Sequence, residues 1–104
     1  MEHLLESDWK HYHTLTPKLL SRYCESVMAE AVKLATDTTQ QDAFTRYAAF
    51  YEFVHEQDKF LSQEGIAHRR SRAVDSIQGC RSRGLFTEEE FAKFSEELRS
   101  LIRR

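Results

Sequence analysis

Residues 17–36 read PKLLSRYCESVMAEAVKLAT, and this stretch decides the fold class. Its apolar side chains recur every three or four positions, which is the spacing of a helix and not of a strand. They cover nearly half of the helix circumference, so we expect this helix to pack against more than one neighbour. Thr16 precedes Pro17, and a hydroxyl followed by a proline is typical of a helix start. The sequence therefore predicts a helix that begins at Pro17 and ends at residue 36.

The same spacing continues on the C-terminal side of this stretch. Helices are predicted over residues 40–64, 66–83 and 87–102, with a polar connection before the first of them. Gly84 would end the second of these helices in the left-handed conformation. The spacing leaves open whether Gly65 breaks the chain between two helices or lies within a longer one.

The last predicted helix has the clearest start in the chain. Thr87 and Glu90 have the spacing of a capping box, and Phe86 and Phe91 have that of a hydrophobic staple. At the other end of the chain, residues 1–15 are predicted to be an N-terminal arm or a short helix. The fold class that follows is all-α: a small antiparallel bundle of four main helices, with a fifth if the arm is helical, in one domain over residues 1–104.

The composition agrees with a small globular protein. The chain has 104 residues, 15 Lys and Arg, 17 Asp and Glu, and a formal net charge of −2. Three glycines and one proline are too few turn-forming residues for an all-β fold. No apolar run is long enough for a membrane span, and the acidic residues near the N-terminus argue against a secretory signal. Cys24 and Cys80 do not make a disulfide framework, so we expect a cytoplasmic protein.

No set of residues with the pattern of an active site or a metal site stands out. Glu52 and His55 have the Glu-x-x-His spacing of di-iron bundles, but such bundles use it twice, and here it occurs once. Cys24 and Cys80 fall on apolar stripes, where thiols are usually inert. The remaining histidines near the N-terminus are interpreted as surface residues: His3, His11 and His13. The sequence therefore predicts no catalysis, no metal and no cofactor.

The positive charge is concentrated in one segment. Residues 65–83 hold five arginines and one aspartate, while residues 1–64 hold 6 basic and 11 acidic side chains. An arginine-rich helix could bind the phosphates of a nucleic acid, although the acidic remainder of the chain would repel a polyanion. Arg70 and Arg81 fall in the apolar sector of this helix, where each needs a carboxylate partner. The sequence leaves open whether that carboxylate belongs to this chain or to a partner.

The aromatic residues are concentrated between residues 44 and 60. One stripe, predicted to face the core, consists of Phe44, Tyr47, Phe50, Tyr51, Val54 and Leu61. Phe53 and Phe60 fall outside it, on a second strip with Ala49. Either this helix is central and wrapped by the others, or another chain covers the second strip.

These patterns favour a non-enzymatic protein–protein interaction module that acts as a regulator, adaptor or anti-activator and self-associates as a homodimer. A nucleic-acid-binding regulator that uses the arginine-rich helix is the alternative. The predicted partner-binding residues are Phe53, Phe60, Ala49, Arg69, Arg70 and Arg72.

Overall fold

The computed structural model describes residues 4–39 and 42–102 and confirms an all-α fold. The helices are α1 (Glu6–Ala35), α2 (Ala43–Ser62), α3 (Ala73–Ser82), α4 (Glu88–Ala92) and α5 (Glu96–Leu101), and a short 3₁₀ helix, η1 (Arg70–Arg72), precedes α3. None of the described helices is both long enough and apolar enough to cross a lipid bilayer.

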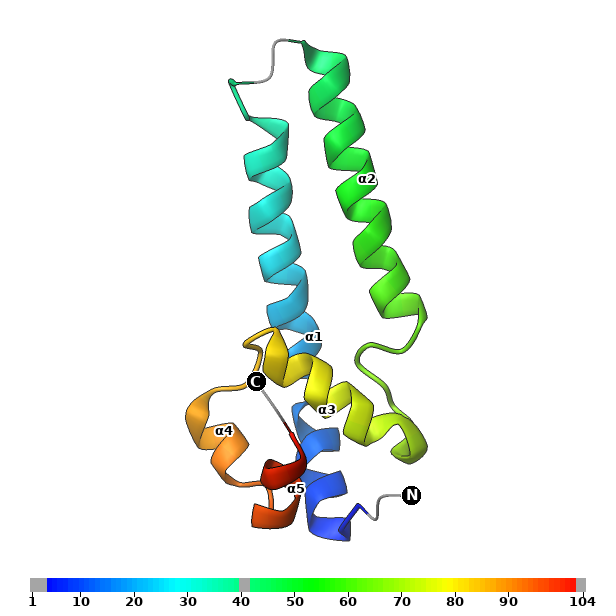
Figure 1. The fold of residues 1–104 in the computed structure, drawn as a ribbon, viewed down its shortest axis with the longest axis vertical. Helices are drawn as coiled ribbons and strands as arrows, with labels where there is room; N and C mark the ends of the chain where they lie inside the picture. Colours follow the sequence, from blue (N-terminus) through cyan, green and yellow to red (C-terminus); the bar gives the residue numbers. More distant parts are fainter. Residues whose placement is uncertain (1–3, 40–41, 103–104) are drawn as a thin grey trace.

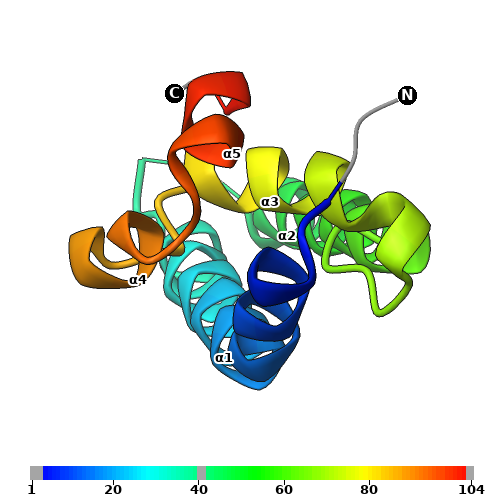
Figure 2. The same cartoon turned by 90° about the horizontal axis from the view of Figure 1, so that it is seen from below.

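The two long helices form an antiparallel hairpin that gives the molecule its elongated shape (Figure 1). The molecule measures 52 by 24 by 21 Å. α3, α4 and α5 gather along one side of the N-terminal half of α1, as the view from below shows (Figure 2). The hairpin therefore has a proximal end that the other helices cover and a distal end formed by α1 and α2 alone.

The prediction that a helix starts at Pro17 is wrong, because α1 begins at Glu6 and passes through this proline without a break. A proline inside a helix has no N–H for the carbonyl four residues earlier, which here belongs to His13. The hydroxyl of Thr16 donates to that carbonyl at 2.8 Å and so replaces the missing bond. Thr16, which the sequence predicted to be a helix cap, therefore lies inside α1 and satisfies the carbonyl that Pro17 leaves without a donor. Much of the predicted N-terminal arm also belongs to α1.

The predicted helix over residues 87–102 is two helices, α4 and α5. Ser95 starts the second of them, since its side chain accepts a hydrogen bond from the N–H of Leu98 at 3.2 Å. The buried carboxylate of Asp8 accepts from both the N–H and the hydroxyl of Ser95, at 2.8 and 2.6 Å. This contact with α1 holds the chain in the turn between the two helices.

Gly65 does separate two helices. α2 ends at Ser62, and Glu64 has a φ of 61°, which puts it in the left-handed region. A side chain at Gly65 would collide with the ring of Phe60, so only glycine fits at this close approach. The prediction of a helix from residue 66 is wrong, because Ile66 and Ala67 are buried in a non-helical segment and α3 starts at Ala73.

The helix-end motifs predicted in the C-terminal part are confirmed. Thr87 and Glu90 form the capping box, and the rings of Phe86 and Phe91 lie 6.1 Å apart as a staple. Gly84 has a φ of 71° and ends α3 as predicted.

The core cluster lies at the proximal end. The fully buried Tyr12 is central to it: its hydroxyl donates to the carbonyl of Ala67 at 2.5 Å and lies 2.7 Å from the hydroxyl of Ser76. Ser76 also binds the backbone of Ala67 and Gly65, so it holds the segment before α3 against α1. The core cluster consists of Tyr12, Leu15, Leu19, Tyr23, Ile66, Ala73, Ile77, Cys80, Leu85, Phe86, Phe94, Leu98 and Ile102.

Candidate interaction surface

The aromatic side chains of α2 do not lie where the sequence placed them. Phe44, Tyr47 and Tyr51 were assigned to the core stripe, but 77 %, 62 % and 59 % of their surface is exposed. The structure describes every residue of α2, and none of them is buried. The reason is that α1 alone packs against the distal part of α2. One neighbouring helix covers only a narrow strip, and the residues beside that strip stay in solvent.

Exposed apolar side chains also occur on α1, where Met28 and Val32 are 56 % and 62 % exposed. Phe44, Tyr47 and Tyr51 line one hollow together, and we call these three residues the hairpin face.

The aromatic side chains of the hairpin face stack on one another and on a neighbouring histidine. The rings of Tyr47 and Tyr51 stack with their centroids 6.4 Å apart, and the ring of His55 stacks on Tyr51 at 5.9 Å. Successive rings are one helical turn apart, so they form a ladder along the outside of α2. The ladder is amphipathic, because each tyrosine presents a flat apolar ring and a polar hydroxyl.

Shallow hollows lie along the hairpin. One is lined by Phe44, Tyr47, Tyr51, Glu52 and His55, and a second, at the tip of the hairpin, is lined by Ala35, Arg46, Tyr47 and Phe50. Nearer the core, a groove between the helices is lined by Cys24, Met28, Val54, Asp58 and Leu61.

The other flank of the hairpin is acidic. Ala49 and Phe53, two of the predicted partner-binding residues, line a groove there together with Leu34. Its remaining lining side chains include Glu30, Glu52 and Glu56. Glu52 also lines the aromatic hollow, so this acidic groove and the hairpin face adjoin each other on α2.

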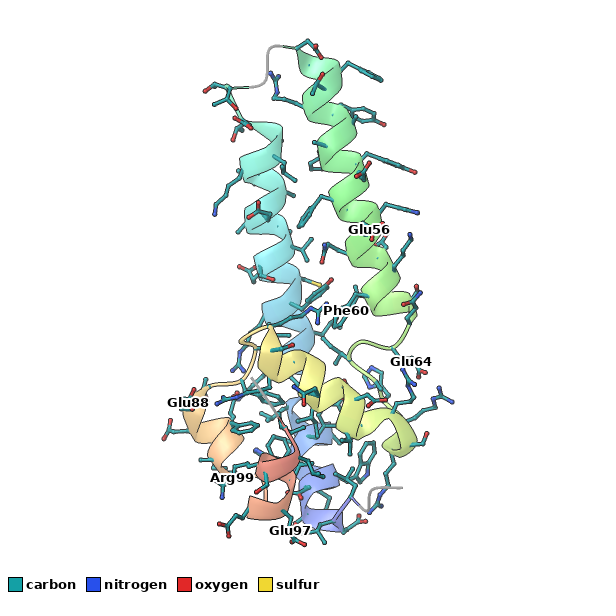
Figure 3. The ribbon with its side chains drawn as sticks, viewed as in Figure 1. Glu56, Phe60, Glu64, Glu88, Glu97 and Arg99 are labelled. Atoms are coloured by element: carbon teal, nitrogen blue, oxygen red, sulfur yellow. The ribbon has the colours of Figure 1, made fainter. Side chains whose placement is uncertain are left out.

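Phe60 is not on either flank. Its ring packs on Tyr23 with the centroids 4.6 Å apart, and the guanidinium of Arg83 lies 3.9 Å from its ring centre. Figure 3 shows Phe60 pointing from α2 towards the junction with α1 and α3. It is partly buried against the core cluster, so it anchors α2 to the proximal end.

The three predicted arginines form ion pairs within the chain. Arg69 binds Glu64 through two nitrogen atoms, and Arg70 binds Glu6 at 2.6 Å and the carbonyl of Leu4 at 3.2 Å. Arg72 lies 3.9 Å from Asp75. The structure thus places the six predicted residues in three separate regions, and their binding role stays a prediction.

Arg81, whose partner the sequence left open, also binds within the chain. Its Nη1 lies 3.4 Å from the carboxylate of Glu88, and its guanidinium lies 3.9 Å from the ring centre of Phe91.

The residues considered for catalysis and metal binding are dispersed or engaged elsewhere. Burial raises the pKa of the Cys80 thiol to about 11, the opposite of what a reactive thiolate needs. The Nε2 atom of His11 lies 2.6 Å from the carbonyl of Glu90, while His55 belongs to the aromatic ladder. Among residues 4–39 and 42–102, no three histidine, cysteine or acidic side chains are grouped closely enough to hold a metal ion. His3 lies outside the described residues.

Comparison with protein-family models, with curated proteins and with solved structures finds no match to the chain.

Proposed function

We propose that the chain is a non-catalytic helical interaction module that binds another protein chain through the hairpin face, as a small regulator, adaptor or anti-activator would. The proposal depends on one observation. The side chains of Phe44, Tyr47 and Tyr51 are exposed to solvent on α2, a helix that has no buried residue. Contiguous exposed apolar patches mark interaction sites in soluble proteins. Tyrosine is also among the residues most enriched at binding hot spots.

The energetic balance of the distal hairpin supports the same proposal. In residues 24–35 of α1 and 43–57 of α2, Ala31 is the one buried residue. Helices in proteins owe most of their stability to the packing of an apolar face against other elements. A partner on the hairpin face would supply the packing that the distal end does not obtain from α3, α4 or α5.

Nucleic-acid binding by the arginines of residues 69–83 is the alternative. The ion pairs of Arg69 and Arg70 weigh against it, because phosphates would have to displace Glu64 and Glu6. Fluorescence anisotropy with a labelled DNA duplex at low salt tests this alternative. Binding that is lost in Arg69→Ala would favour it over protein docking.

Photocrosslinking in living cells of the source tests the proposed docking directly. A benzophenone amino acid is placed at position 47, within the hairpin face, and in a matched variant at Thr45, an exposed position on the same turn of α2 but on its other side. We expect a discrete covalent adduct with a protein from position 47 and not from position 45. Equal labelling at the two positions, or no adduct at position 47, contradicts the proposal.

A further inference from the structure

We infer that the acidic groove is a second docking site, and that its occupant is a basic amphipathic helix of a partner protein. This inference goes beyond the proposed function, because it concerns a different side of α2. Residues two positions apart in a helix point in nearly opposite directions. Ala49 and Phe53 in the acidic groove therefore face away from Tyr47 and Tyr51 of the hairpin face.

The floor of the acidic groove is apolar and comes from both long helices. Leu34 of α1 and Phe53 of α2 are half-buried there, and Ala49 is exposed. The small side chain of Ala49 leaves space that a larger apolar side chain of a partner can fill. A groove between two antiparallel helices accepts a third helix, which lays its apolar face along the floor.

The carboxylates of the acidic groove also come from both helices. Glu30 belongs to α1, while Glu52 and Glu56 belong to α2 and are one helical turn, about 6 Å, apart along its axis. An occupant that satisfies them needs cations along both edges of its apolar stripe, spaced by one turn on the edge that faces α2. This pattern is that of a basic amphipathic helix.

These carboxylates can accept a partner's cations. The side chain of Glu52 makes no ion pair within the part of the chain that the structure describes. Glu30 lies 3.8 Å from Lys33, and Glu56 lies 3.2 Å from Lys59, with half or more of each side chain exposed. Exposed pairs of this kind contribute little to stability, so a partner's arginine or lysine can take the place of either lysine.

The charge of the distal hairpin favours the same occupant. Residues 24–58 contain seven acidic and two basic side chains, whereas the whole chain has a net charge of only −2. The field of this region attracts a cationic segment and repels the phosphates of nucleic acids and of anionic lipids.

Two other occupants fit the acidic groove less well. A second copy of this chain that seated its own acidic groove there would bring identical carboxylates together, which is unfavourable. A single metal ion needs several ligands at one point, and no three acidic, histidine or cysteine side chains within residues 4–39 and 42–102 are close enough to hold one. Carboxylates that are spaced along a groove suit a row of cations on a helix.

Fluorescence anisotropy with a labelled synthetic peptide tests the inference on the purified full chain, at about 100 mM salt. The peptide has about 18 residues, or five helical turns, with leucines at helical spacing and arginines along both edges of the leucine stripe. Its control has the same composition in a shuffled order that removes the stripe. We expect the amphipathic peptide to bind about tenfold more tightly than the shuffled one.

A charge reversal tests the carboxylates of the acidic groove. Glu56→Lys places a cation where the peptide needs an anion, so we expect it to raise the dissociation constant of the amphipathic peptide about tenfold. The matched control is Glu25→Lys, which changes the net charge equally at an exposed position of α1 outside the groove. The control should change the dissociation constant by less than about twofold.

An uncharged substitution tests the floor. Ala49→Gln fills part of the acidic groove, so we expect it to weaken binding of the amphipathic peptide about tenfold. The control is Ala48→Gln, at the neighbouring exposed position, which lines the aromatic hollow instead. Glutamine is a good helix former, and circular dichroism of each variant checks that the helices are retained.

Three results would overturn the inference. They are an amphipathic peptide that binds no more tightly than the shuffled one, equal weakening by Glu25→Lys and Glu56→Lys, and an Ala49→Gln variant that binds like wild type. The proposed function fails separately, because Ala49 and Glu56 do not line the aromatic hollow and its test is the adduct at position 47.

Discussion

Replacing Glu90 with glutamine is expected to destabilise the protein and to change how its stability depends on pH. Glu90 forms the most completely satisfied ion pair in the described part of the chain. Arg22 donates to its two carboxylate oxygens at 2.6 and 2.9 Å, and the N–H of Thr87 donates to one of them at 3.0 Å. Hydrogen bonding from Arg22 lowers the pKa of Glu90 from its usual 4.5 to about 2.

The size of the effect follows from that change in pKa. A tenfold change in proton affinity corresponds to about 1.4 kcal/mol, so the full fall would contribute about 3 kcal/mol. The Glu90 side chain is 15 % exposed and that of Arg22 is 35 % exposed, and water screens part of the interaction. We therefore expect Glu90→Gln to lower the free energy of unfolding by about 2 kcal/mol at neutral pH.

The pH dependence of this difference provides the sharper test. Because the folded-state pKa lies below the unfolded-state value, the stabilisation by Glu90 is complete above pH 4.5 and is lost as the pH falls towards about 2. Urea unfolding followed by circular dichroism, at fixed protein concentration, measures the difference between wild type and Glu90→Gln at each pH. The control, Glu89→Gln, removes a neighbouring exposed charge and should change stability by less than about 0.5 kcal/mol.

Two results would refute this reasoning. One is a difference between wild type and Glu90→Gln that stays below about 0.5 kcal/mol at neutral pH, since the ion pair would then contribute no more than an ordinary surface pair. The other is a difference that persists undiminished at pH 2, since protonation of Glu90 should by then have removed most of it.

Two further substitutions test the packing of the proximal end by the same urea measurement. Gly65→Ala should cost about 1–3 kcal/mol, because the added methyl group collides with the ring of Phe60. Its control, Gly79→Ala in α3, meets only ordinary contacts and should be neutral or stabilising by up to about 1 kcal/mol. Equal effects of the two would contradict the close approach at Gly65. Tyr12→Phe should cost about 1–3 kcal/mol, since the buried carbonyl of Ala67 loses its donor, and an unchanged urea midpoint would show that this bond contributes nothing.

The sequence predicted the fold class and the helix ends that depend on local chemistry. The capping box of Thr87 and Glu90 and the left-handed Gly84 each involve residues within a few positions of one another, so their pattern is visible in the sequence. Ser95 belongs to the same kind of signal, because a serine followed by two glutamates is a good helix start. The sequence did not show that a new helix starts at Ser95, because the carboxylate that binds Ser95 belongs to Asp8, 87 residues earlier.

The start of α1 was missed for a different reason. Thr16 followed by Pro17 has the same sequence whether the threonine caps a new helix or bonds back into an existing one. Tyr12, Leu15, Leu19 and Tyr23 recur with helical spacing across the proline, and all four are buried on one side of α1. Weighing that continuous stripe above the local pair of residues would have predicted one helix.

The sequence predicted that aromatic side chains of α2 form an interaction surface, but it did not predict which of them are exposed. The sequence showed that α2 has more aromatic side chains than one small bundle can bury. Which of them remain exposed depends on the direction from which α1 approaches, and the sequence does not contain that direction in any local pattern. α1 packs nearer to Phe53 and Phe60 than the hydrophobic stripe suggested, so Phe44, Tyr47 and Tyr51 are the residues left in solvent.

The separation of core and surface along one long hairpin has a physical consequence. All the buried side chains of the core cluster lie at the proximal end, and the exposed aromatic ladder lies at the distal end. A region with few buried contacts opens locally at a lower free energy than the core does. The distal helices can therefore adjust to a partner without disturbing the contacts of Tyr12 or Glu90. The same division means that stability and association depend on different residues of α1 and α2, although both helices run through the two regions without a break.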